Sequence, residues 1–91
     1  MQIRLRKEAA EDLIHIRNYY DEIAPDSTNR VLSDIFATIV RLKIFPSAGS
    51  TFTDENCRRV VSAKDRFKIA YIVTGQTIDI LGVFRQQNRQ V

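Results

Sequence analysis

The spacing of apolar residues changes at Pro46, and this change limits the folds that the chain can adopt. Before Pro46, two stretches repeat apolar residues every three or four positions, which is the period of an amphipathic helix. After it, apolar and polar residues alternate over most of the chain, which is the period of a half-buried strand. A sequence of helices followed by strands is typical of an α+β domain, in which the helices cover one face of a sheet.

Two helices are predicted, and a proline separates them. The first spans Lys7 to about Ala24, and Pro25 ends it because a proline ring disfavours helical angles at the preceding residue. The second is capped by Asp26 or Ser27 and ends near Phe45. The apolar stripe of the first helix is Ala9, Leu13, Ile16, Tyr20 and Ile23, and that of the second is Leu32, Ile35, Ile39 and Leu42, widened by Val31, Phe36 and Val40.

Four strands are expected around these helices. They are Gln2 to Arg6 before the first helix and, after a loop over Pro46 to Asn56, Arg58 to Ala63, Phe67 to Val73 and Gln76 to Phe84. The last three strands should form an antiparallel meander, since tight turns at Lys64-Asp65 and Thr74-Gly75 join them. The fold class is therefore a two-layer α+β domain of order β-α-α-β-β-β, with a helix hairpin on an antiparallel sheet. Its 91 residues fit one domain, 1–91.

Basic residues are concentrated in the last third of the chain. Residues 1–56 hold 7 basic and 9 acidic residues, whereas residues 57–91 hold 7 basic and 2 acidic residues. This distribution favours an anionic partner, such as nucleic acid or an acidic protein, although a solvated basic surface is the alternative. Guanidinium groups on rigid strands can clamp phosphates or carboxylates through paired hydrogen bonds. The candidate target-binding residues are Arg58, Arg59, Lys64, Arg66, Lys68, Arg85 and Arg89.

The sequence offers little for metal, cofactor or membrane chemistry. His15 is the only histidine and Cys57 the only cysteine, so neither a zinc site nor an internal disulfide is predicted. Three glycines leave no Gly-rich phosphate loop. No apolar run approaches the roughly 18 residues of a membrane span, and the start of the chain lacks the apolar core of a signal peptide. We therefore expect no metal, no cofactor, no membrane association and a cytoplasmic location.

Five short segments form a pattern whose order is more specific than any one of them. They are Ala9–Ile16 (A-x-x-D-L-x-x-I), Phe45–Gly49 (F-P-x-x-G), Arg58–Val61 (an arginine opening a strand), Arg66–Tyr71 (close to Y-R-I-x-Y) and Ile78–Phe84 (close to I-x-I-L-x-V-x-H). In this order and spacing the chain resembles the ParE/RelE toxins of bacterial type II toxin–antitoxin systems. The resemblance covers nearly the whole chain and implies the same β-α-α-β-β-β fold.

Two departures favour the ParE branch of this family over the RelE branch. RelE-type members resemble ribosome-dependent mRNA endonucleases and rely on a basic cluster with a histidine or aromatic residue near the C-terminus, whereas this chain has Phe84 at the usual histidine position and no tyrosine after Tyr71. RNA cleavage needs a group that removes the 2′-OH proton and groups that stabilise the phosphate. If the chain were an RNase, Arg59, Arg66 and Arg85 would fill the second role. No residue is an obvious candidate for the first role, which a lysine such as Lys64 or Lys68 could fill if its pKa were lowered.

The resemblance to ParE implies a non-catalytic toxin that binds and inhibits DNA gyrase, with growth arrest and plasmid stabilisation as consequences. It also implies a cognate, ParD-like antitoxin whose C-terminal segment wraps the toxin, over the apolar helix surface and a free sheet edge. The expected antitoxin contacts are Leu13, Ile16, Tyr20, Phe36 and Val40. Two alternatives remain, an mRNA endonuclease of RelE type and an inactive domain that only holds its antitoxin. Both a homodimer and a hetero-oligomer with the antitoxin are compatible with this surface.

Overall fold

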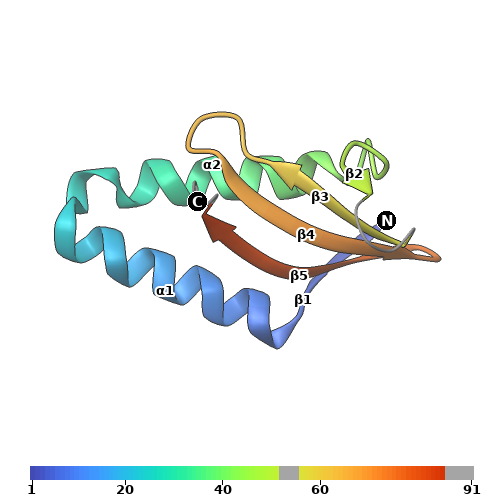
Figure 1. Cartoon of the computed structure of the whole chain (residues 1–91), viewed down its shortest axis with the longest axis horizontal. Coiled ribbons are helices and arrows are strands. Elements are labelled where there is room, and N and C mark those ends of the chain that lie inside the picture. Colours follow the sequence, from blue (N-terminus) through green and yellow to red (C-terminus); the bar gives the residue numbers. More distant parts are fainter. Residues whose placement is uncertain (52–55, 86–91) are drawn as a thin grey trace, which may run out of the picture.

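Two helices cover one face of a five-stranded sheet in the computed structural model, which describes residues 1–51 and 56–85. The elements are β1 (Gln2–Leu5), α1 (Lys7–Ile23), the 3₁₀ turn η1 (Pro25–Ser27), α2 (Thr28–Arg41), β2 (Ser50–Thr51), β3 (Cys57–Val61), β4 (Phe67–Thr74) and β5 (Thr77–Arg85). Figure 1 shows α1 and α2 running side by side in opposite directions. The predicted two-layer α+β class and the order of its helices and strands are confirmed, with β2 as an addition.

The sheet has the strand order β1-β5-β4-β3-β2. Strands β3, β4 and β5 form the expected antiparallel meander, and β2 pairs antiparallel to β3. Strand β1 lies parallel to β5, so the sheet is mixed and not antiparallel throughout. A tight hairpin turn forces two strands to be antiparallel, but β1 is followed by the helix pair and not by such a turn. The long connection through the helices allows β1 to pair parallel to β5.

The core lies between the helices and the facing side of the sheet. From the sheet it takes Phe67, Ile69, Tyr71, Ile78, Ile80 and Val83, and from the helices and the turn after α2 it takes Ala9, Leu13, Tyr20, Val31, Ile35, Ile39 and Leu42. The predicted widening of the α2 stripe is confirmed for Val31 but is wrong for Phe36 and Val40, which are 42% and 57% exposed. These two lie about 140° and 180° around the helix from Val31, and therefore point away from the core.

The junction between the helices differs from the predicted cap. Ser27 precedes α2 in helical conformation and makes no side-chain capping hydrogen bond. Instead, the Thr28 hydroxyl donates to the Asp21 carboxylate at 2.7 Å and ties the end of α1 to the start of α2. Helix α2 ends at Arg41, earlier than the predicted Phe45, and a turn follows in which the Phe45 N–H donates to the Arg41 carbonyl.

Turn chemistry also moves two strand boundaries. The β4–β5 turn is Gly75-Gln76, one residue later than predicted, because Thr74 pairs with Thr77. Gly75 takes the positive φ, 58°, that the turn needs. Strand β3 ends at Val61 and not at Ala63, and residues 62–66 turn the chain into β4 with Arg66 at φ 62°. The predicted loop over 46–56 contains β2, which at two residues is too short to leave a periodic signal.

Helix α1 is joined to the sheet by Asp12, the aspartate of the A-x-x-D-L-x-x-I segment. The pairing of β4 with β5 slips between Ala70 and Tyr71, which leaves Leu81 as an extra residue in β5. Next to this bulge, the Val83 N–H donates to the Asp12 carboxylate at 2.9 Å. At Gly82 a Cβ would lie 3.3 Å from the same carboxylate oxygen, so a larger residue would crowd this contact. Asp12 therefore fixes the position of α1 against the bulged part of β5.

Replacing Asp12 by alanine is expected to lower the free energy of unfolding by about 1–2 kcal/mol, because the part-buried Val83 N–H loses its charged acceptor. Urea unfolding followed by circular dichroism measures the change. Asp12→Asn is the matched control, since its amide oxygen can still accept, and it should lose less than half as much. Equal stability of Asp12→Ala and the wild type would contradict this role.

Candidate interaction surfaces

The structure divides the predicted basic set between the two faces of the sheet. Arg59 pairs with Ala70, and Lys68 pairs with Val61 and Phe84, so both point away from the helices. Arg58 lies on the helix side, where it donates to the Gly49 carbonyl at 2.7 Å and to the Ser47 carbonyl at 3.4 Å. Lys64 and Arg66 are exposed in the turn between β3 and β4. Arg89 lies outside the described residues.

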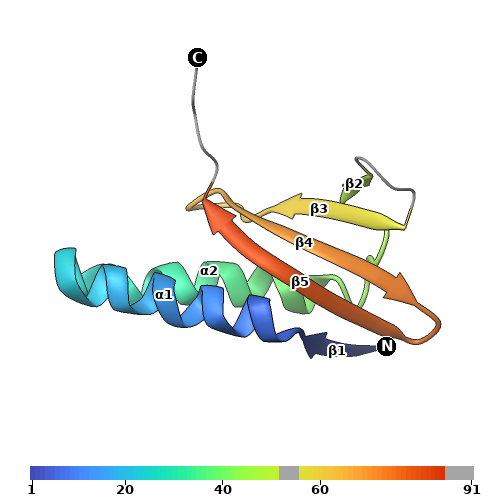
Figure 2. The same ribbon diagram turned by 60° about the horizontal axis from the view of Figure 1, so that its bottom comes forward.

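The face that bears Arg59 and Lys68 has no helix over it in the part of the chain that the structure describes, as Figure 2 shows. Apolar side chains of Val61, Ile72 and Phe84 share this open face and are half-buried or exposed. Lys64 lines a hollow beside Asp34 and Arg41 of α2. We call Arg59, Arg66 and Lys68, together with this open sheet surface, the basic face. It combines cationic side chains with apolar area, as protein-binding surfaces do.

Asp79 is the acidic residue of β5 on this same side of the sheet. Its carboxylate is almost fully buried and accepts from Arg4 Nε at 3.1 Å and from the Arg6 guanidinium at 3.4 Å. The hydrogen bond from Arg4 holds the pKa of Asp79 below its ordinary value, against the opposing effect of burial, and Arg6 adds to it. The negative charge of Asp79 is therefore matched by arginines of the N-terminal segment and does not neutralise the basic face.

The turn that carries Lys64 and Arg66 is held by Asp34 of α2. The Asp34 carboxylate accepts from the Asp65 N–H at 2.7 Å and from the Lys64 N–H at 3.2 Å. Ser62 also bonds to Asp34, and its hydroxyl oxygen accepts from the Phe67 N–H at 2.9 Å. Burial by itself would raise the pKa of Asp34, but these hydrogen bonds outweigh burial and hold its pKa below the ordinary value of 3.8. The turn is thus locked onto the helix layer.

Arg85 lies on the helix side of the sheet, at the end of β5. Its two terminal nitrogens each donate to the Tyr20 hydroxyl at 2.8 Å. The guanidinium carbon lies 5.2 Å from the centre of the Phe67 ring and 5.8 Å from that of Tyr20, within the range of cation–π attraction. Arg59 and Arg85, two of the three arginines expected to act together in an RNase, therefore lie on opposite faces of the sheet.

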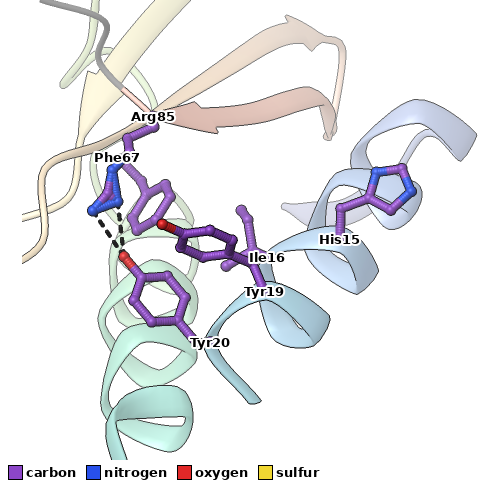
Figure 3. A pocket seen from close by; sticks show the side chains of 6 residues that line it. All are labelled: His15, Ile16, Tyr19, Tyr20, Phe67 and Arg85. Carbon is purple, nitrogen blue, oxygen red and sulfur yellow. Dashed lines mark hydrogen bonds between the residues drawn. The ribbon is translucent and has the colours of Figure 1, made fainter. Parts of the chain in front are cut away.

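A pocket of about 350 Å³ opens beside Arg85. We call it the Arg85 pocket, and its lining residues are His15, Ile16, Tyr19, Tyr20, Phe67 and Arg85. Figure 3 shows Tyr19 and Tyr20 projecting from α1 toward Phe67 and Arg85, with His15 one turn nearer the start of the helix. The two tyrosine rings meet edge to face at 5.2 Å. His15, Tyr19 and Phe67 are not among the site residues predicted from the sequence, although positions 15, 16, 19 and 20 share one helical face.

The exposed face of α2 forms a second apolar surface. A hollow there is lined by Ser33, Phe36, Ala37, Val40, Arg41 and Ile44. The predicted antitoxin contacts thus fall into groups: Phe36 and Val40 line this hollow, and Ile16 and Tyr20 line the Arg85 pocket. Leu13 is mostly buried and borders a shallow groove that Phe36 also lines. The five residues do not form one patch.

Neither a metal site nor a membrane span is found in the described part of the chain. Within residues 1–51 and 56–85, no three histidine, cysteine, aspartate or glutamate side chains gather where they could hold a metal ion. Neither α1 nor α2 has the length and apolar character to cross a membrane.

Comparisons with known proteins point to one family. Residues 3–89 match the family model described as "ParE toxin of type II toxin-antitoxin system, parDE". Toxin ParE2 of Mycobacterium tuberculosis is 31% identical over 84 residues, which cover 90% of this chain and 78% of the relative.

Solved structures support the same fold. The chromosomal ParDE toxin–antitoxin system from P. aeruginosa matches with a TM-score of 0.82 at 24% identity, over 96% of this chain and 97% of that chain. The intact E. coli RelBE toxin–antitoxin complex matches with a TM-score of 0.63 at 9% identity, over 96% and 98%.

Proposed function

Since the chain belongs to the ParE toxin family of type II toxin–antitoxin systems, we propose that it inhibits DNA gyrase and that a cognate antitoxin neutralises it. The observation that carries this proposal is the family match, which spans all the described elements from Ile3 onward. The separation of Arg59 from Arg85 favours gyrase binding over RNA cleavage, because the arginines suggested for phosphate stabilisation do not form one cluster.

We assign the contact with gyrase to the basic face. Arg59 and Lys68 are carried by paired strands, and Arg66 by a turn that Asp34 holds, so the backbone that presents these side chains is held in place. A cluster of positive charges steers and orients an anionic partner. Arg58 and Arg85 are left out of this surface because they face the helix side and bind the 47–49 loop and Tyr20.

The proposal is tested by expressing the protein from a tightly controlled promoter. Growth should stop with induction of the DNA-damage response, since a blocked gyrase leaves damaged DNA, and co-expression of the antitoxin encoded beside the toxin should restore growth. Arrest with an early stop of protein synthesis and no DNA-damage response would favour a RelE-type mRNA endonuclease. Unimpaired growth at full expression would favour an inactive antitoxin-binding domain.

The surface that we propose for the antitoxin begins on the exposed face of α2. Phe36, Val40 and Ile44 present apolar side chains there at helical spacing, and the hollow between them suits the apolar stripe of a partner helix. Exposed apolar residues gathered in this way are typical of an interaction site. Strand β1 adds a free edge, since in the described sheet it pairs with β5 alone, and such an edge can accept a partner strand.

Val40→Asp is expected to weaken antitoxin binding at least tenfold, because a carboxylate would enter the apolar centre of the contact. The fold should be unaffected, since Val40 is an exposed residue. Isothermal titration calorimetry with the purified antitoxin measures the affinity. Asn18→Asp is the matched control, because it places the same charge at an exposed position of α1, outside the hollow on α2. Wild-type affinity of Val40→Asp would remove the α2 face from the antitoxin site.

A further inference from the structure

The Arg85 pocket is a third surface, separate from the basic face and from the α2 face. It lies between α1 and the ends of β4 and β5, on the helix side of the sheet. Its volume of about 350 Å³ falls within the range of small-ligand and side-chain pockets. Tyr19, at its rim, is 55% exposed and meets Tyr20 edge to face, so its ring is available to a ligand in the pocket.

The charge of Arg85 has no carboxylate partner among the described residues. The ion pairs there join Arg4 and Arg6 to Asp79, and Arg30 to Asp65. Arg85 is held instead by a neutral hydroxyl and two rings, which fix its plane without neutralising it. A guanidinium carries five N–H donors in a fixed fork, and the two bonds to Tyr20 leave donors for another acceptor.

Apart from Arg85, the lining of the pocket is mainly apolar and therefore suits an apolar group of a ligand. The side chain of Ile16 and the rings of Tyr19, Tyr20 and Phe67 line the pocket, and none of the lining residues is acidic. The site therefore combines an apolar wall with a fixed, unneutralised cation. Tyrosine and arginine are also the residues that most often dominate binding energy at protein interfaces.

We infer that the Arg85 pocket receives an apolar side chain of the antitoxin, while Arg85 binds a carboxylate that stands next to that side chain in the antitoxin sequence. The inference rests on the proposed function, in which the partner is an antitoxin, and on the complementarity of the pocket to a peptide that is both acidic and apolar. The α2 face and the Arg85 pocket, which we both assign to the antitoxin, are separate surfaces. One antitoxin segment must therefore extend around the helix pair to fill both.

The site is tested first with small probes, independently of any antitoxin. In nuclear magnetic resonance titrations of the ¹⁵N-labelled protein, 3-phenylpropionate should shift the Arg85 Nε–H signal and the backbone signals of residues 15–20. Its uncharged analogue 3-phenylpropionamide should bind at least tenfold more weakly. Equal binding of acid and amide, or binding of neither, would overturn the inference without any variant having to fold.

Two variants then separate the cation from the apolar wall. Arg85→Gln should abolish the preference for the acid, whereas Tyr19→Ala should weaken acid and amide by similar factors, because Tyr19 makes no hydrogen bond with Arg85. With the purified antitoxin, Arg85→Gln should lower the affinity at least tenfold. Antitoxin binding that is unchanged in a folded Arg85→Gln variant would refute the inference and leave the proposed function standing. Acid-selective probe binding by a protein that binds no antitoxin would instead refute the proposed partner.

Discussion

Replacing Asp34 by alanine is expected to lower the free energy of unfolding by about 3 kcal/mol. The buried carboxylate accepts the N–H groups of Lys64 and Asp65 and a bond from Ser62, and each donor loses a charged acceptor. For a domain of this size, such a loss corresponds to a fall of roughly 15 °C in Tm. Differential scanning calorimetry at neutral pH measures it, with Asp26→Ala, an exposed aspartate in the turn before α2, as the control.

The effect of Asp34 should also depend on pH in a defined direction. Because the pKa of Asp34 is lower in the folded protein than its ordinary value of 3.8, its ionised form stabilises the fold. This contribution is complete above pH 3.8 and is lost as the pH falls through the folded-state pKa. The difference in stability between the wild type and Asp34→Ala should therefore shrink below pH 3.8. The smaller difference between the wild type and Asp34→Asn should shrink over the same range, because neither alanine nor asparagine ionises. A difference that grows in acid would contradict the assigned cause.

Reversing two charges on the basic face should weaken inhibition of gyrase at least tenfold. In the Arg66→Glu, Lys68→Glu double variant, two attractive contacts become repulsive, and like charges that face each other across an interface lower the affinity and slow association. The two side chains extend from the turn and from β4 into open surface, so unfolding temperature should change little. The protein concentration that halves the rate of DNA supercoiling measures the effect.

The control for this prediction carries the same change of net charge on the helix side. Lys7→Glu with Lys43→Glu reverses two exposed lysines, one at the start of α1 and one after α2. This variant should inhibit gyrase like the wild type, because the charges lie outside the basic face. If the two double variants lost inhibition equally, net charge and not the basic face would govern the interaction.

Most of the fold could be predicted because it follows from local sequence signals. Pro25 ends the first helix, Ile35 and Ile39 repeat at helical spacing, and tight turns join the last three strands, so the elements and their order could be read without tertiary information. The parallel pairing of β1 with β5 could not be read in this way. It depends on contacts between residues far apart in the chain, such as Ile3 with Ile78, which no local pattern encodes.

The candidate sites were harder to predict, and β5 shows why. Strict alternation from Ile78 and Ile80 would turn Phe84 toward the helices and Arg85 away from them. The extra residue Leu81 reverses this pattern, so Phe84 is exposed and Arg85 contacts Tyr20. A one-residue bulge thus decides on which face of the sheet Arg85 lies. The sequence feature that marks the bulge is Gly82, the residue after Leu81.

The measurement that tests the central proposal most directly is a supercoiling assay with purified DNA gyrase, relaxed plasmid and the wild-type protein. A parallel sample assays ribosome-dependent mRNA cleavage by the same preparation. We predict that micromolar protein stops supercoiling, that the antitoxin restores it, and that mRNA stays intact. Full supercoiling at micromolar protein, with or without cleavage of mRNA, would contradict the assignment of DNA gyrase as the target.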